Sequence, residues 1–142
     1  MARIKEPQKI AALQRIPLFE DLDKKELQFL ASLVTEVPVR PGTKLVKQGE
    51  IGLEAMIVEE GTADVIRDGN KVDEIGPGDF FGEMSLIHHQ PRNADVVATS
   101  DMIVLDMSAR EFATMLDAYP DVAMKILRTV VARLAASQEA SV

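Results

Sequence analysis

The chain has 142 residues, no cysteine, a formal net charge of −7 and 46% hydrophobic residues. This length can bury a core without disulfides. The lack of cysteine excludes disulfides, thiolate metal sites and a cysteine nucleophile. A pI of about 4.8 argues against direct nucleic-acid binding, because affinity for DNA depends largely on Lys and Arg contacts with phosphates.

The sequence also bears on compartment and domain organisation. No apolar run approaches the length of a membrane-spanning helix, and the first residues lack the apolar core of a signal peptide. We therefore expect a cytoplasmic protein without membrane association. Its length predicts one domain over residues 1–142.

Helical patterns come first, within residues 1–35. A short helix is expected within residues 1–13. Asp23 and Glu26 then form a D-x-x-E capping box, and apolar residues follow at helical spacing. This pattern predicts an amphipathic helix over residues 24–34.

Residues 36–107 have the pattern of many short strands. Apolar and polar residues alternate, and turn signals recur every eight to twelve residues, as at Pro41-Gly42 and Asp68-Gly69-Asn70. This spacing is typical of a sandwich or barrel. The predicted fold class is mainly β with flanking α: a jelly-roll-like β-barrel with N-terminal helices and two C-terminal helices.

Helical periodicity returns in residues 108–136. Ser108 and Glu111 form an S-x-x-E capping box, Pro120 ends the first helix, and Asp121 is expected to cap the second. The apolar face of residues 122–134 is too broad to be left in water. That face predicts packing on this chain's own barrel or on a partner.

The stretch Phe80–Ala98 has the features of an anion site. A strand end and a glycine precede a short helical run, Glu83–Ile87, and a polar loop leads to Arg92 and a further strand. Glycine lets a ligand approach the backbone, and the first turn of a helix offers unpaired N–H groups to a phosphate. Arginine can grip phosphate oxygens in a bidentate way. Because Glu83 would repel phosphate, sugar hydroxyls are its expected partners.

The pattern F-G-E-M-S-L followed by P-R-N-A resembles the phosphate-binding cassette of cyclic nucleotide-binding domains. These domains are the sensor modules of the catabolite activators, the kinase regulatory subunits and the cyclic-nucleotide-gated channels. The resemblance covers roughly residues 15–135 and assigns the cassette to residues 80–96. It implies that Glu83 binds the ribose 2′-hydroxyl and that Arg92, with the N–H groups of Met84 and Ser85, binds the cyclic phosphate. The other cassette residues expected at the ligand are Gly82, Asn93 and Ala94.

The resemblance also extends to the purine. Val65 and Ile75 match positions that line the purine pocket of the family, although both also fit a plain core role. On the last helix, Arg133, Ser137 and Gln138 match the lid over the base. Solvated helix surface is an equally good interpretation of these three residues.

Some residues depart from the family pattern. Asn93 stands where a Thr is commonly linked to cGMP preference, so cAMP is favoured over cGMP as the ligand. Asp95 shares the side-chain parity of Asn93, and we expect it near a positive group or in solvent. Where the family usually has Asp, aromatic and aromatic residues, this chain has Leu53, Ala55 and Met56. These changes would loosen the barrel or widen the pocket.

Neither a metal site nor a catalytic site is expected. His88 and His89 are neighbours that cannot both face one metal from a regular strand, and no third ligand lies at sensible spacing. This argues against a cupin-type metal enzyme, which would share the jelly-roll shape. A structural ion pair is the plain alternative for Glu83 and Arg92.

The sequence therefore predicts a sensor without enzymatic activity or cofactor, in which a cyclic nucleotide moves the C-terminal helices. Residues 122–134 would form a homodimer helix, as in the activators, or contact an unknown effector protein. The alternative is a domain of the same fold that binds no nucleotide and serves as an interaction or dimerisation scaffold. The changes at Leu53, Ala55, Asn93 and Asp95 motivate that alternative.

Overall fold

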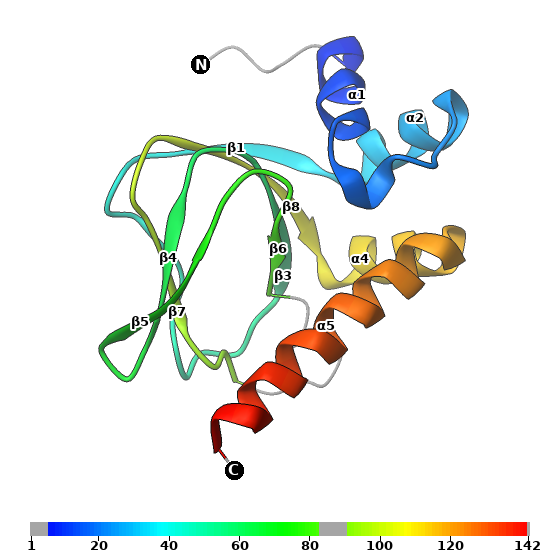
Figure 1. Ribbon diagram of the computed structural model, residues 1–142. Coiled ribbons are helices and arrows are strands. Elements are labelled where there is room, and N and C mark those ends of the chain that lie inside the picture. Colours follow the sequence, from blue (N-terminus) through cyan, green and yellow to red (C-terminus); the bar gives the residue numbers. More distant parts are fainter. Residues whose placement is uncertain (1–5, 83–90, 142) are drawn as a thin grey trace.

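The computed structural model describes residues 6–82 and 91–141 (Figure 1). Helices flank a set of short strands, as the sequence predicted. In chain order the elements are α1 (Glu6–Gln14), η1 (Pro17–Phe19), α2 (Lys24–Leu33), β1 (Thr35–Val39), β2 (Lys44–Val46), β3 (Glu54–Glu60), β4 (Ala63–Arg67), β5 (Asn70–Ile75), β6 (Phe80–Phe81), β7 (Asp95–Ala98), β8 (Met102–Ser108), α4 (Ala109–Ala118) and α5 (Pro120–Ser141).

The described strands form two antiparallel four-stranded sheets, with the orders β1-β8-β3-β6 and β2-β7-β4-β5. One core lies between the two sheets and contains Val58 and Val104 from the first sheet and Ala63 and Val96 from the second. Because strand side chains alternate between faces, the neighbours of these residues point away from this core. The arrangement confirms the predicted jelly-roll-like barrel with flanking helices.

A second core lies between the first sheet and the helices. Ile57 and Leu105 oppose each other on β3 and β8, and both are buried against the helical layer. The helices contribute large apolar side chains, among them Leu30, Phe112 and Ile126. In Figure 1, α5 runs from this layer along the barrel toward the end that carries the β4–β5 turn.

Local sequence signals determine two helix starts and one hairpin turn. The side chain of Asp23 accepts from the Glu26 N–H at 2.8 Å, and that of Ser108 accepts from the Glu111 N–H at 3.2 Å, so both predicted capping boxes are formed. In the Asp68–Gly69 turn both residues have positive φ, 53° and 79°, as a two-residue type I′ hairpin requires.

One helix start was predicted wrongly. Asp121 was expected to cap the last helix, but α5 already begins at Pro120, and Asp121 lies in its first turn. The fixed φ of proline suits the first helical position, so Pro120 ends α4 and also opens α5. The amphipathic helix expected over residues 24–34 ends at Leu33, and α1 begins at Glu6.

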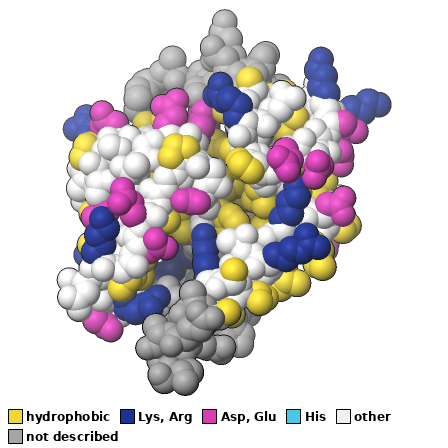
Figure 2. All heavy atoms as spheres, in the orientation of Figure 1, with side chains coloured by type: hydrophobic (Ala, Val, Ile, Leu, Met, Phe, Trp, Pro, Cys, Tyr) yellow, Lys and Arg dark blue, Asp and Glu magenta, His cyan; other side chains and the backbone are white. Residues whose placement is uncertain are grey.

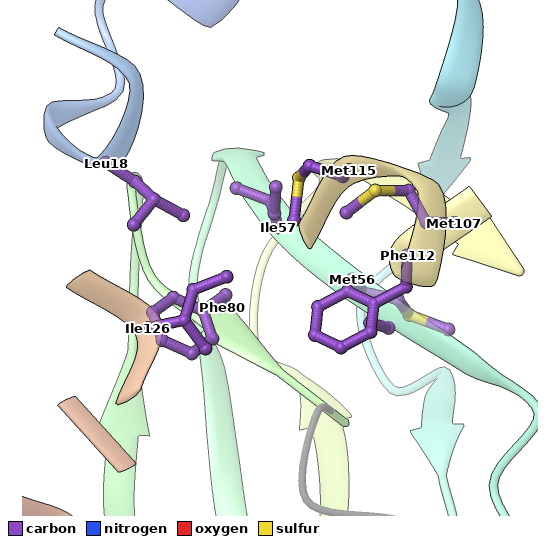
Figure 3. Close-up of a pocket in the computed structure, with 9 residues that line it drawn as sticks. Leu18, Met56, Ile57, Phe80, Met107, Phe112, Met115 and Ile126 are labelled. Atoms are coloured by element: carbon purple, nitrogen blue, oxygen red, sulfur yellow. The ribbon is translucent and has the colours of Figure 1, made fainter. Parts of the chain in front are cut away.

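The helices leave a small void where they meet the barrel (Figure 3). Phe112 and Met115 of α4 and Ile126 of α5 point toward Phe80 and Met107 of the sheet. The apolar cavity between them has a volume of about 10 Å³ and is also lined by Ala55 and Met56. Ala55 and Met56, two of the residues that depart from the family pattern, therefore lie at this junction.

None of the helices in residues 6–82 and 91–141 is long and apolar enough to cross a bilayer.

Candidate functional site

Gly82 ends strand β6 at a point where backbone and a guanidinium come very close. Its φ is +88°, and a Cβ there would lie 2.6 Å from Arg92 Nη1 and 2.8 Å from the Glu54 carbonyl oxygen. Only glycine adopts this conformation without strain and leaves this space. The glycine predicted from the motif is therefore required by the approach of Arg92 itself.

Arg92 is buried at this end of the barrel, with 9% of its surface exposed. Its Nη1 donates to the Gly82 carbonyl at 2.9 Å, and its Nη2 donates to the Glu54 carbonyl at 2.7 Å. A buried guanidinium is costly unless its donors are satisfied and its charge is compensated. The side chain thus joins the two segments at which strands β6 and β3 meet the site.

The backbone of Arg92 is held from the opposite side by the turn before β3. Arg92 N–H donates to the Glu50 carbonyl at 2.7 Å, and Gly49 N–H donates to the Arg92 carbonyl at 2.8 Å. An isolated bridge pairs Ile51 with Pro91. These contacts hold the backbone of Pro91 and Arg92 against the turn at residues 49–51.

Gln48 ties this turn to the β4–β5 hairpin. Its Nε2 donates to Asp68 Oδ1 at 2.8 Å, and Asp68 N–H donates to its Oε1 at 2.9 Å. Its own N–H donates to Asp95 Oδ1 at 2.7 Å. The sequence analysis missed this residue, because its partners lie 20 and 47 positions away and form no local motif.

Acidic groups lie close to the buried arginine. Burial, the charge of Glu54 and a hydrogen bond with Glu54 raise the pKa of Asp106 to about 7, against an opposing effect of Arg92. Asp106 opposes Met56 in the register of β8 with β3. Arg92 thus lies close enough to Asp106 to lower the pKa of this carboxyl group.

The geometry therefore combines a glycine at positive φ, a buried arginine and a neighbouring carboxyl group at one barrel end. Figure 2 shows Lys and Arg side chains around a hollow in the lower left of this face. The family model described as "Cyclic nucleotide-binding domain" matches residues 36–119. The chain belongs to the cyclic nucleotide-binding domain family.

Individual relatives agree with this assignment. The chain is 37% identical over 87 residues to a cAMP-dependent protein kinase regulatory subunit of Schizosaccharomyces pombe, covering 61% of this chain and 21% of that protein. It is 31% identical over 118 residues to a cyclic nucleotide-gated potassium channel of Rhizobium etli, covering 83% and 33%. The chain thus spans a third or less of the length of these curated relatives.

A solved structure gives the same picture. The regulatory subunit of a cAMP-independent protein kinase A from Trypanosoma brucei superposes with a TM-score of 0.79 at 29% identity. The match covers 87% of this chain and 45% of that one. The chain therefore shares its fold with this kinase regulatory subunit, which belongs to a kinase described as cAMP-independent.

Several predicted site residues of this family member lie together. Gly82 and Arg92 are in contact, and Asn93 and Ala94 continue from Arg92 into β7, Asn93 exposed and Ala94 buried. Asp95 lies where the sequence predicted, beside a positive group: Lys44 Nζ is 3.5 Å from its Oδ2. The hydrogen bond from Gln48 N–H lowers the pKa of Asp95, and Lys44 adds to this effect.

The two predicted purine positions differ in depth. Val65 is partly buried and packs on the core between the sheets, two residues from the Arg67 end of β4. Ile75 is fully buried in the same core, where it pairs with Ala63. Val65 therefore lies nearer the barrel end that holds Arg92, and Ile75 lies deeper.

Arg133 of α5 contacts the strand that leads into the cassette. Its Nη2 donates to the Phe80 carbonyl at 2.9 Å, and its guanidinium carbon lies 4.9 Å from the centre of the Phe80 ring. The alternative of a purely solvated helix surface is therefore wrong for Arg133. The side chains of Ser137 and Gln138 lie outside the described residues.

The remaining predicted positions have different outcomes. Leu53 is 72% exposed next to the site, whereas Ala55 and Met56 are buried. Glu83, Met84 and Ser85 lie outside the described residues, as do His88 and His89. Among the described residues, no group of three or more His, Cys, Asp or Glu side chains is placed to hold a metal ion.

Proposed function

We propose that the chain is a cyclic nucleotide sensor whose ligand binds between Gly82 and Ala94. The observation that carries the proposal is the buried Arg92 beside a glycine that has no room for a Cβ. In this proposal Arg92 and the N–H groups of Met84 and Ser85 bind the cyclic phosphate, and Glu83 binds the ribose 2′-hydroxyl. The role is binding, without catalysis, cofactor or metal.

A phosphate at this place would bring a full negative charge to Arg92. Arg92 donates to two carbonyl oxygens, which carry only partial charge. A phosphate oxygen adds the attraction of a full negative charge, and it can be bound in a bidentate way by the guanidinium. Ligand entry would therefore draw the guanidinium toward the phosphate and loosen its contacts with Gly82 and Glu54.

The purine would lie along β4, on the side of Val65. An apolar wall packs against the face of a purine but does not distinguish adenine from guanine. We favour cAMP over cGMP because Asn93, and not Thr, follows Arg92. The assignment of kinase regulatory subunits as cAMP-dependent in the names of several relatives supports the same choice.

Ligand binding would be transmitted to α5 through Phe80. Phe80 is two residues before Gly82 and is the partner of Arg133. A shift of the cassette would change both the hydrogen bond and the ring contact of Arg133. The mechanism is then a population shift of α5 between two packings, driven by the different affinity of the ligand for each.

The exposed side of α5 is the proposed partner surface. Val122, Ile126 and Val130 of this helix pack on the chain's own core. Four further apolar residues are exposed on it: Met124, Leu127, Val131 and Leu134. We propose that this part of residues 122–134 forms a homodimer or contacts an effector protein.

Thermal melts test the ligand assignment. Three proteins would be melted with cAMP, cGMP and AMP: the parent chain, the variant Arg92→Glu and the variant Arg40→Glu. Arg40 lies at the exposed β1–β2 turn, so its variant is a control for the change of charge. A ligand at about a hundredfold its dissociation constant adds about 2.7 kcal/mol, which raises the midpoint of a domain this size by several degrees. We expect a rise with a cyclic nucleotide, none with AMP, and loss of the rise in Arg92→Glu only.

A second candidate function is an interaction scaffold that binds no nucleotide. The exposed Leu53 and Ile51 beside the site, 72% and 64% accessible, favour it, because such residues mark contact surfaces when they cluster. No shift with either cyclic nucleotide at millimolar concentration, in folded protein, would favour this scaffold over the sensor.

A further inference from the structure

Arg67 is a second arginine at the barrel end that holds Arg92. It is the last residue of β4, directly before the Asp68–Gly69 turn. Ala63 and Val65 precede it at two-residue spacing, and both belong to the core between the sheets. Because strand side chains alternate, Arg67 extends this inward-facing row to the mouth of the barrel.

Arg67 contacts the chain directly after Arg92, within the segment from Gly82 to Ala94 where the ligand is proposed to bind. Its Nε donates to the carbonyl oxygen of Asn93 at 3.1 Å, and Asn93 follows Arg92 in the chain. The hairpin beside it is held in place by the paired hydrogen bonds between Gln48 and Asp68. The hydrogen bond to Asn93 therefore places the guanidinium beside the backbone that follows Arg92.

The charge of Arg67 has no paired carboxylate among residues 6–82 and 91–141. The ion pairs found there involve Lys44, Lys71 and Lys125. The nearby acids are engaged elsewhere, Asp68 with Gln48 and Asp95 with Lys44. Beyond the Nε that donates to Asn93, the guanidinium of Arg67 carries two further NH2 groups.

The electrostatics of the site give such a cation a role. Arg92 is the buried cation, but it lowers the pKa of Asp106, so this carboxyl group lies near enough to offset part of its charge. The whole chain carries −7, so its overall field repels anions. An anionic ligand would therefore need a further positive group close to the place where it binds.

We propose that Arg67 is a second phosphate-binding residue of this site, whose terminal NH2 groups bind an oxygen of the cyclic phosphate from the barrel mouth while Nε keeps the carbonyl of Asn93. This inference rests on the proposed function. Since the cyclic phosphate is common to cAMP and cGMP, the contribution of Arg67 is the same for both ligands. A residue that contacts the purine edge would instead affect the two ligands differently.

Calorimetric titration of the full chain with cAMP and with cGMP tests this role. The variants are Arg67→Gln, which keeps a donor for Asn93 but removes the charge, Arg67→Lys, which keeps the charge, and Arg40→Gln as a control. We expect Arg67→Gln to weaken both ligands by a similar factor of about ten or more, equivalent to about 1.4 kcal/mol. Arg67→Lys should recover most of this loss, and Arg40→Gln should bind like the parent.

Three results would overturn the assignment. The first is unchanged affinity in Arg67→Gln, and the second is a loss confined to one of the two nucleotides. The third is an equal loss in Arg67→Lys, which would show that the positive charge at this position does not contribute to ligand binding. Failure of the proposed function looks different: the parent chain then binds neither nucleotide, and the inference about Arg67 falls with it. Circular dichroism melts of each variant confirm that it is folded.

Discussion

Arg133 and Phe80, 53 residues apart in the chain, are joined by a hydrogen bond of 2.9 Å and by a guanidinium 4.9 Å from the ring centre. The contact fastens α5 to the strand that runs into the proposed ligand segment. A cation over an aromatic ring and a hydrogen bond each contribute about 0.5–1.5 kcal/mol. Together they are comparable to the energies that shift a two-state equilibrium.

Arg133→Gln should therefore release the C-terminal half of α5. We expect faster amide hydrogen exchange in residues 127–135 and a loss of about 1–2 kcal/mol in unfolding free energy. Arg128→Gln, at an exposed position five residues earlier, is the control. Equal exchange rates in the two variants would show that the contact with Phe80 does not hold the helix.

Gly82→Ala should be more harmful than a change of backbone conformation alone predicts. The new Cβ would meet Arg92 Nη1 at 2.6 Å and the Glu54 oxygen at 2.8 Å. Gly42→Ala is a close control, because its φ is +85° and no atom lies within 4 Å of the added Cβ. Both variants incur about 1–2 kcal/mol of left-handed strain.

The difference between these two variants isolates the contact with Arg92. Urea unfolding should show Gly82→Ala losing about 1–3 kcal/mol more than Gly42→Ala, a typical cost of overpacking. Nucleotide-induced thermal shifts should disappear in Gly82→Ala and persist in Gly42→Ala. Equal stability losses would mean that the Arg92 side chain moves away from the new Cβ without lowering the free energy of unfolding.

How much the sequence predicted depends on the range of each interaction. The capping boxes at Asp23 and Ser108 and the Asp68–Gly69 turn involve neighbours, so pattern alone predicted them. The motif also predicted that Gly82 and Arg92 belong to one site. The motif could not predict why they meet. The guanidinium of Arg92 donates to the carbonyls of both Gly82 and Glu54, and this requires β3 and β6 to lie side by side.

Other contacts had no signal in the sequence. Gln48, Arg67 and Arg133 bind partners 20, 26 and 53 positions away. Such contacts follow from strand register and from the path of α5, and neither can be predicted from residue type. Asp121 shows the opposite error: a good capping residue was preferred to a proline that itself suits the first helical turn.

Gln48→Ala should weaken the ligand site without unfolding the protein. The variant loses both side-chain hydrogen bonds to Asp68, each contributing about 0.5–1.5 kcal/mol, but keeps the backbone bond to Asp95. The hairpin that carries Arg67 then becomes less fixed against the turn that holds Arg92. Calorimetry should show weaker cyclic nucleotide binding than in the exposed control Gln28→Ala, and equal affinities would contradict this role.

Asp106 should make stability fall with rising pH. Burial and Glu54 raise its pKa from an ordinary 3.8 to about 7, so between these values the folded chain binds a proton that the unfolded chain has lost. Stability from this group is complete below about pH 4 and is lost as the pH rises through 7, because folding then favours the protonated form. Asp106→Asn removes this dependence.

The Asn variant should therefore gain on the parent chain as the pH rises. The difference between their melting midpoints should increase from pH 5 to pH 8, in favour of Asp106→Asn. Burial also raises the pKa of Glu36 and Glu59, but these groups are present in both proteins and cancel in the difference. Asp101→Asn, at an exposed position before β8, is the control for removal of an acidic side chain. A constant difference for Asp106→Asn would show that its carboxyl group is already ionised at pH 5 in the folded chain.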